Sequence, residues 1–220
     1  MEIPVRETKH LADIELSPPA KDGGASALAA LALRQTIREI AAKPLPPQLL
    51  SNLLWAAWGV NRQHWGPFGA CGRTAASASN SQEILLFVAM KDAVYRYDGL
   101  NHRLALVAAG DWRGSALTPH QRNVDAKAPL QLIFVADLHR LTHTQGFEEP
   151  GLHDPEVQKS YYFVDTGLIA GNVYLFAAAE GLAAWFHNCN KVRLHEALGL
   201  NLDQRVLFAQ SVGYPAANGA

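Results

Sequence analysis

Cysteine is scarce in this chain, with two residues in 220. Cys71 and Cys189 lie far apart and form no CxxC pair, so neither a disulfide framework nor a thiolate zinc site is indicated. Long apolar runs are also lacking, because the longest, from Ile84 to Met90, is far too short to cross a bilayer. Residues 1–25 contain no continuous apolar stretch of the kind that a secretory signal needs. We therefore expect a cytoplasmic protein with no membrane partner.

An excess of charge of either sign is lacking as well, since the chain has 19 Lys and Arg residues and 20 Asp and Glu residues. The formal net charge is -1. This balance provides no basic stripe for a nucleic acid and no polybasic anchor for a membrane surface. The hydrophobic share of 49% is enough for the core of one medium-sized domain. Pro4, Pro18, Pro19, Gly23 and Gly24 interrupt the beginning, which predicts an extended arm over 1–25 and one domain over 26–220.

The common catalytic signatures are absent: no GxGxxG follows a strand, and GxxxxGK[ST], GxSxG and HExxH do not occur. His139 and His143, followed by His153 and Asp154, could bind a metal from one helix face, but the polar residues between them indicate a surface loop, and we predict no metal site. Cys189 with a nearby histidine is a conceivable nucleophile pair without supporting context. No catalytic side chain is predicted.

The periodicity of the chain predicts helices and strands without a regular βαβ alternation, which indicates an α+β fold. Ser26 can cap a first helix, prolines can start a second, and Gly167 and Gly171 in the longest would let another helix approach. The predicted helices cover 27–33, about 47–58, 114–128, 157–182 and 192–198. The predicted strands cover 84–89, 94–97, 104–108, 130–136, 183–186 and 205–212, and 60–71 is predicted to be a loop.

Two polar stretches could bind a ligand. Gly72 to Gln82 combines small residues with hydroxyl and amide groups. This composition is typical either of a ligand-binding loop or of a surface loop with no binding role. Arg34 to Arg38 places two guanidinium groups four residues apart, on one side of the chain if the preceding helical turn continues. These cations could bind a dianion or could oppose the dipole at a solvated helix end.

The order of these stretches resembles the nitroreductase family of flavin enzymes from about Leu28 to Pro215. The resemblance rests on Arg-x-Thr-x-Arg, PLPPQLLSNLLWAAWGVNR, GRTAASASNSQEI, DTGLIAGNVYLFAAAEGLA and QSVGYP, in this order. Within the family, the apolar strand followed by Val94 to Asp98 is similar to a short branch related to the thiazole- and oxazole-forming peptide dehydrogenases. The resemblance implies a homodimer of α+β subunits with a central mixed or antiparallel sheet, a long core helix and FMN in two interfacial clefts.

The resemblance also implies the residues that bind the cofactor. The phosphate and ribityl chain would lie on Arg34, Gln35, Thr36 and Arg38, since a phosphomonoester needs guanidinium and hydroxyl donors. The loop that reaches the flavin from the partner subunit corresponds to Ala76, Ser77, Ala78 and Asn80, with Ala76 in place of the family's proline. The segment whose backbone faces flavin N5 corresponds to Phe186, His187, Asn188 and Cys189.

Two functional interpretations follow. The first is an FMN-dependent oxidoreductase that transfers hydride from NADH or NADPH through flavin N5 to an electron-poor small molecule, a nitroaromatic or a quinone, by a ping-pong mechanism. A variant oxidises a thiazoline- or oxazoline-like peptide ring. The second is a flavin- or partner-binding protein without turnover. Many relatives carry basic residues after the final strand, whereas no cation follows Arg205 here, so we expect FMN to be retained less tightly than in those relatives.

Overall fold

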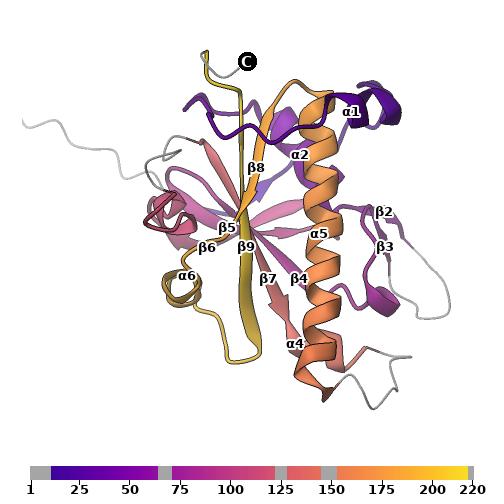
Figure 1. Ribbon diagram of the computed structural model, residues 1–220, viewed down its shortest axis with the longest axis vertical. Helices are drawn as coiled ribbons and strands as arrows, with labels where there is room; N and C mark the ends of the chain where they lie inside the picture. The colour runs from indigo at the N-terminus through magenta and orange to yellow at the C-terminus, as the bar shows by residue number, and fades with distance from the viewer. Residues whose placement is uncertain (1–10, 64–70, 122–127, 145–152, 218–220) are drawn as a thin grey trace, which may run out of the picture.

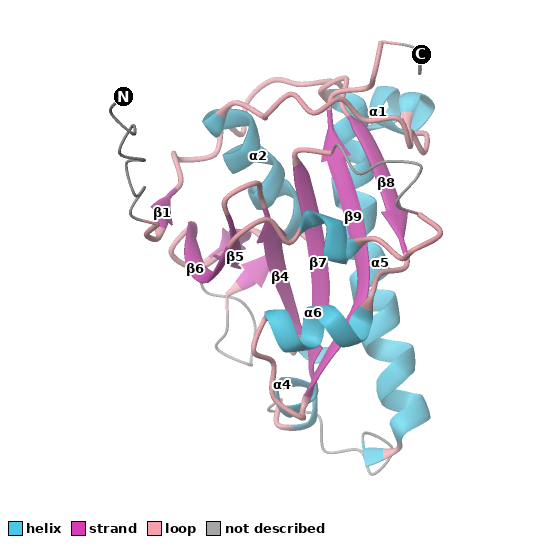
Figure 2. Ribbon diagram, turned by 90° about the vertical axis from the view of Figure 1, so that its left-hand side faces the viewer, coloured by secondary structure: helices cyan, strands magenta, loops and turns pink. Residues whose placement is uncertain are grey.

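In the computed structural model, which describes residues 11–63, 71–121, 128–144 and 153–217, a seven-stranded sheet separates a long helix from a short one. The strand order is β1-β6-β5-β4-β7-β9-β8, and every neighbouring pair is antiparallel. Helix α5 runs along one face of the sheet and α6 lies on the other (Figures 1 and 2). The predicted α+β class is confirmed, and the sheet is antiparallel rather than mixed.

The bounds of the elements agree with most of the predicted ranges. The sheet strands are β1 (Ile14–Glu15), β4 (Ile84–Ala89), β5 (Ala93–Asp98), β6 (Arg103–Ala109), β7 (Leu130–Asp137), β8 (Ala183–His187) and β9 (Gln204–Gly213). The helices are α1 (Ala27–Leu33), α2 (Pro47–Trp58), α4 (Leu138–Thr142), α5 (Pro155–Ala179) and α6 (Lys191–Ala197). A separate hairpin consists of β2 (Val60–Arg62) and β3 (Gly72–Arg73), and short 3-10 turns cover Ala78–Asn80 and Arg113–Ala116.

The centre of the sheet is apolar on both faces because it is covered on both sides. Every residue of β4 is buried, and its alternate side chains enter two different clusters. Leu86 and Val88 pack on the side of α2 and α5, whereas Leu85 and Phe87 pack on the side of α6. The continuous apolar run in the sequence is therefore a strand covered on both faces, as its composition predicted.

Helix α5 begins at Pro155, where the side chain of Asp154 accepts from the backbone nitrogen of Glu156. By length and composition it is the one described helix that could cross a membrane, but it packs along the sheet (Figure 1). Part of its surface is uncovered: Phe163, Val164 and Leu168 are exposed, and a Cβ added to Gly167 would meet no atom within 4 Å. Exposed leucines of α1 add to this apolar surface, namely Leu28, Leu31 and Leu33.

Two local predictions were wrong. The predicted helix over 27–33 is confirmed as α1, and it does not continue into the arginine motif, because Arg34 is its C-cap and the following residues are not helical. The predicted helix over 114–128 is reduced to a short 3-10 turn, with 122–127 outside the described residues. The predicted loop after Gly59 contains β2, which pairs with β3.

The described part of the arm, from Leu11, packs against the body. Ile14 pairs with Leu104 of β6, and the side chain of His102 contacts the carbonyl of Ser17. Residues 1–10 lie outside the described residues.

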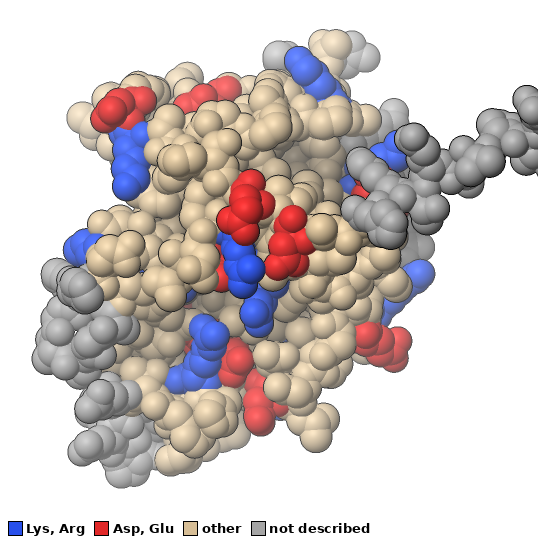
Figure 3. Space-filling view, turned by 180° about the vertical axis from the view of Figure 1, so that it is seen from behind, with Lys and Arg blue, Asp and Glu red and all other residues tan. Residues whose placement is uncertain are grey.

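The side of the molecule that faces away from the viewer in Figure 1 carries charges of both signs, and basic and acidic side chains lie beside each other there (Figure 3). Surface ion pairs have the same character, since Arg103 pairs with Asp13 and Asp98 and Arg113 pairs with Asp111. Pairs this exposed contribute little to stability.

Candidate functional site

The arginine motif forms an extended segment across one end of the sheet. The backbone nitrogen of Ile37 donates to the carbonyl of Ala184 in β8 over 3.1 Å, and Ile40 forms a bridge with Pro215 beyond β9. The two anchors fix a segment whose own sequence has no helical or strand period. Arg34 and Thr36 lie at Tyr174 of α5, and Arg38 lies at Trp185 of β8.

Aromatic rings lie beneath the two cations. The guanidinium carbon of Arg34 is 5.6 Å from the ring centre of Tyr174, and that of Arg38 is 5.9 Å from the ring centre of Trp185. Thr36 Oγ1 lies 3.1 Å from the hydroxyl of Tyr174. Both arginines and Gln35 are exposed, and within the described ranges neither arginine has an ion pair with a carboxylate. Two solvent-facing guanidinium groups beside a hydroxyl are suited to a phosphomonoester.

The second predicted segment, Phe186 to Cys189, comprises the last two residues of β8 and the two residues that follow it. The backbone nitrogen of Phe186 donates to the hydroxyl oxygen of Tyr174 over 2.9 Å. His187 is buried, with Nδ1 2.7 Å from the carbonyl of Asn188 and Nε2 3.0 Å from Ser211 Oγ. Burial lowers the pKa of His187, so its imidazole is neutral at pH 7. Asn188 is the one exposed side chain of the four.

Cys189 is buried in the apolar cluster under α6. Burial raises the pKa of its thiol to about 12, against which nearby Lys191 has only a small effect. A thiol with this pKa is not a nucleophile at neutral pH.

The third predicted segment, Gly72 to Gln82, is a braced loop. Ser77 Oγ accepts from the backbone nitrogen of Gln82 at 3.1 Å, and Asn80 Nδ2 donates to the carbonyl of Cys71 at 3.2 Å. The backbone nitrogen of Ala78 donates to Asp165 Oδ2 of α5 over 2.9 Å. Ala76 is exposed at the outer end of the loop. The loop is thus fixed against α5.

Arg73 belongs to the support of this loop. Its Nε donates to Gln82 Oε1 at 2.6 Å and its Nη1 to the carbonyl of Trp58 at 2.7 Å. The guanidinium also lies over the Trp58 ring, and burial lowers its pKa. This arginine is held inward, so we assign it no role in binding a phosphate.

Within one chain, the arginine segment and the braced loop lie on different sides of α5. The loop is bonded to Asp165, and the arginine segment contacts Tyr174. Nine helical residues separate the two, which corresponds to about 14 Å along the axis and about half a turn around it. A single chain therefore does not bring the two predicted halves of the site together.

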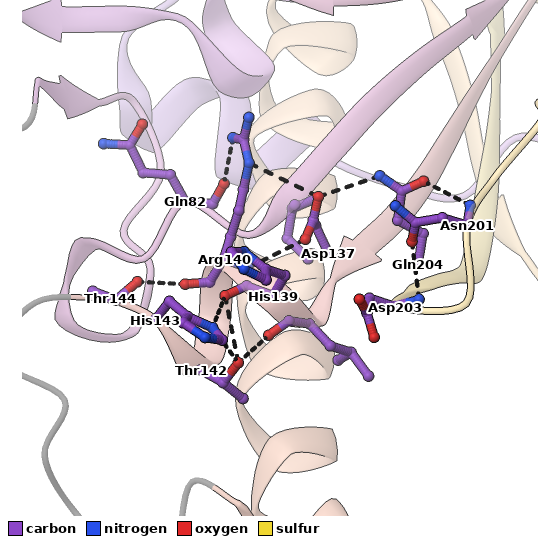
Figure 4. Close-up of polar contacts among 12 residues, drawn as sticks. Gln82, Asp137, His139, Arg140, Thr142, His143, Thr144, Asn201, Asp203 and Gln204 are labelled. Atoms are coloured by element: carbon purple, nitrogen blue, oxygen red, sulfur yellow. Dashed lines mark hydrogen bonds and ion pairs between the residues drawn. The ribbon is translucent and has the colours of Figure 1, made fainter.

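The histidines considered as metal ligands do not form a cluster. His139 and His143 stack with ring centres 4.0 Å apart, and His143 Nδ1 lies 2.9 Å from the carbonyl of His139 (Figure 4). Among the described residues, no group of three or more histidine, cysteine, aspartate or glutamate residues could hold a metal ion.

Comparisons with known proteins identify the family and the fold. A model of the nitroreductase family matches residues 31–214. A crystal structure from Ralstonia eutropha JMP134, provisionally named a nitroreductase, is 33% identical and has a TM-score of 0.82, with 94% of this chain and 91% of that chain covered. A protein of Methanocaldococcus jannaschii, also provisionally named a nitroreductase, is 28% identical over 156 residues, which are 68% of this chain and 71% of the relative.

Nitroreductase A from Vibrio parahaemolyticus shares the fold at 18% identity and a TM-score of 0.58, over 89% of this chain and 70% of that chain. The family-model match and the 33% identical structure assign the α+β scaffold with its long helix to a class of oxidoreductases. The chain belongs to the nitroreductase family, whose members are generally flavin-dependent. The similarity to the peptide dehydrogenase branch stays a prediction.

Two residues that position the site were missed in the sequence. Tyr174 joins Thr36 to Phe186, and Asp165 holds Ala78. Both are polar residues of α5. A carboxylate on a buried helix face could have been noticed, because charged groups are rarely buried without a partner.

Proposed function

We propose that the protein is an FMN-dependent oxidoreductase that accepts electrons from NADH or NADPH and passes them to an electron-poor small molecule such as a nitroaromatic or a quinone. The observation that carries the proposal is the arrangement of Arg34, Thr36 and Arg38 beside Tyr174 and Trp185. Bound FMN would supply a two-electron carrier that takes a hydride from the nicotinamide and gives it to the acceptor. The protein would supply binding, orientation and a positive field.

The proposal places the phosphate and ribityl chain on Arg34, Gln35, Thr36 and Arg38. Each arginine can donate two parallel hydrogen bonds to phosphate oxygens, which an ammonium cannot do. Phe186 to Asn188, at the C-terminal end of β8, would lie beside the edge of the flavin ring. His187 would contribute through the backbone, because both of its ring nitrogens face partners within the chain.

A homodimer is part of the proposal, because the loop of Ala76, Ser77, Ala78 and Asn80 is separated from the arginine segment by α5. A second copy packed on the exposed face of α5 and α1 could bring its own loop to this segment. The exposed apolar residues Phe163, Val164, Leu168 and Leu31 favour such packing, and Gly167 allows close approach. The site would then be incomplete in a monomer, and we propose a cytoplasmic homodimer.

The test is the visible absorption spectrum of the purified protein, recorded anaerobically before and after NADH or NADPH is added. Flavin bands at about one per chain that bleach with a nicotinamide would support the proposal. Bound flavin that no nicotinamide reduces would favour the peptide dehydrogenase variant or a binding protein without turnover. A protein that is colourless and does not take up added FMN would overturn the cofactor assignment.

Leu168→Glu tests the dimer separately. A carboxylate in the apolar strip of α5 should yield a monomer by light scattering and abolish FMN uptake. Val192→Glu is the matched control, since Val192 is also an exposed apolar residue but lies on α6, on the other face of the sheet. A dimer that persists in Leu168→Glu would show that α5 is not the interface.

A further inference from the structure

The loop that precedes β4 has an unfavourable backbone conformation. Ser79, Asn80 and Gln82 have φ angles of 47°, 57° and 50°, in the left-handed region that favours glycine. Conformations of this kind cost of the order of 1 kcal/mol or more per residue. The loop therefore keeps its shape only because surrounding groups hold it.

The surrounding groups come from four elements. Asp165 of α5 accepts from Ala78, and Arg73 of β3 donates to the Gln82 side chain. Arg140 of α4 donates to the carbonyl of Gln82 over 3.4 Å, and Asp137 of β7 approaches the same guanidinium (Figure 4). Asp165 is the contact at the strained turn itself, because Ala78 directly precedes Ser79.

A second carboxyl group is buried next to Asp165. Glu83 follows the loop directly and is 0% exposed, while Asp165 is 3% exposed. Glu83 Oε2 accepts from Ser81 Oγ at 2.6 Å, but no described donor faces its Oε1. The charge of each buried carboxylate acts on the other, and neither has a cation as a bonded partner among the described residues. A proton on Glu83 would remove the repulsion and let Oε1 donate to Asp165.

The electrostatics of the pair agree with this protonation. Burial, and then the charge of Asp165, raise the pKa of Glu83 from 4.5 to about 8, with an opposing effect of the Ser81 hydrogen bond. Burial also raises the pKa of Asp165, and the hydrogen bond from Ala78 opposes this rise. Arg73 and Arg140 donate to Gln82 rather than to either carboxyl group.

We propose that Glu83 and Asp165 share one proton at neutral pH, and that this singly charged pair positions the 77–82 loop for cofactor binding. Glu83 donates to Asp165, and the ionised Asp165 accepts from Ala78. The two carboxyl groups are positioning residues that need not touch the cofactor. The cofactor part of this inference rests on the proposed function, whereas the shared proton and its effect on the loop do not.

The test replaces the shared proton by a permanent amide. Glu83→Gln and Asp165→Asn each keep the size of the side chain and can supply an N–H between the two groups. Asp165→Ala removes the acceptor for Ala78. The readout is hydrogen exchange of the loop amides, corrected for the intrinsic pH dependence and measured without FMN at pH 6, 7.5 and 9.

In the wild-type protein, loop exchange should accelerate about tenfold or more between pH 6 and 9, because Glu83 loses its proton over this range. Both amide variants should exchange slowly at all three pH values, and Asp165→Ala should exchange fast at all of them. Wild-type exchange that is independent of pH, or a Glu83→Gln loop as fast as that of Asp165→Ala, would overturn the shared proton.

FMN titration of the same proteins separates this inference from the proposed function. Asp165→Ala should bind FMN at least about tenfold more weakly than the amide variants, through loss of the loop. Equal FMN affinity in all four proteins would refute the positioning role and leave the cofactor assignment intact. If the wild-type protein binds no FMN but shows the predicted exchange pattern, the proposed function fails and the shared proton stands.

Discussion

The hydroxyl oxygen of Tyr174 accepts a hydrogen bond of 2.9 Å from the backbone nitrogen of Phe186. This contact joins α5 to β8, and the same hydroxyl lies 3.1 Å from Thr36 Oγ1. One phenol thus connects three segments that are distant in the sequence. Its position identifies the end of β8 as the point where the proposed cofactor site is assembled.

Tyr174→Phe should weaken FMN binding and lower stability together. The substitution leaves the half-buried nitrogen of Phe186 without its acceptor, which costs about 1 to 2 kcal/mol. Thermal unfolding and FMN titration measure the two effects. Tyr214→Phe is the control, since its ring lies under Lys43 in the same part of the molecule. A Tyr174→Phe protein with wild-type stability would show that water replaces the hydroxyl.

Arg34→Ala should reduce FMN affinity roughly 10- to 100-fold, which is the usual effect of losing a charge-assisted bond to a phosphate. The fold should persist, because the side chain is exposed. Fluorescence quenching on FMN titration gives the dissociation constant, and Arg193→Ala on exposed α6 is the matched control. Equal affinity in the two variants would place the phosphate elsewhere.

Gly213→Ala should disturb the arginine segment through Ile40, which anchors the end of that segment. A Cβ at this position would lie 2.6 Å from Ile40 Cγ2 and 2.7 Å from Pro129 Cδ, so the Ile40–Pro215 bridge has to shift. We expect a lower melting temperature and several-fold weaker FMN binding. Gly114→Ala is the control, since its Cβ would meet nothing within 4 Å. If both variants bind FMN like the wild type, the bridge does not position the segment.

Cys189 should resist alkylation in the folded protein. The raised pKa of its thiol leaves almost no thiolate at pH 8, and its side chain is buried. Treatment with iodoacetamide followed by peptide mass spectrometry should show Cys189 unmodified in the native protein and modified after denaturation. Rapid native labelling of Cys189 would show that the thiol is accessible and activated.

Stability should decrease as pH rises from about 4.5 to about 8. The folded-state pKa of Glu83 is raised, so the folded protein holds a proton that the unfolded chain has already released, and this contribution is lost as pH passes the folded-state value. Denaturant unfolding of Glu83→Gln over this range should show a weaker pH dependence than wild type. Parallel profiles for the two proteins would contradict the assignment.

Local sequence patterns predicted most helices and strands, because apolar residues that become buried recur with the period of the element that contains them. The apolar run at Ile84–Ala89 and the glycine after Trp58 mark a central strand and a helix end, and the structure has both. The short hairpin of β2 and β3 was missed, because two or three residues are too few to show a strand period.

The two candidate ligand-binding stretches could be recognised in the sequence by their polar composition. The distant residues that hold them in place could not. The arginine segment is extended because distant residues Ala184 and Pro215 bind its backbone, which no local pattern reveals. The partner of Ala78 lies 87 residues away on α5. Proximity of this kind arises only when the sheet and α5 pack together.

The two anchors of the arginine segment also set an order of events during protein synthesis. Ala184 and Pro215 leave the ribosome about 150 or more residues after Arg34, and synthesis proceeds at about 5–20 residues per second. For several seconds the arginine segment is therefore translated but lacks the strands that hold it. If the proposed function holds, a nascent chain arrested before β8 should not capture free cofactor, and cofactor loading would follow the completion of the sheet rather than guide it.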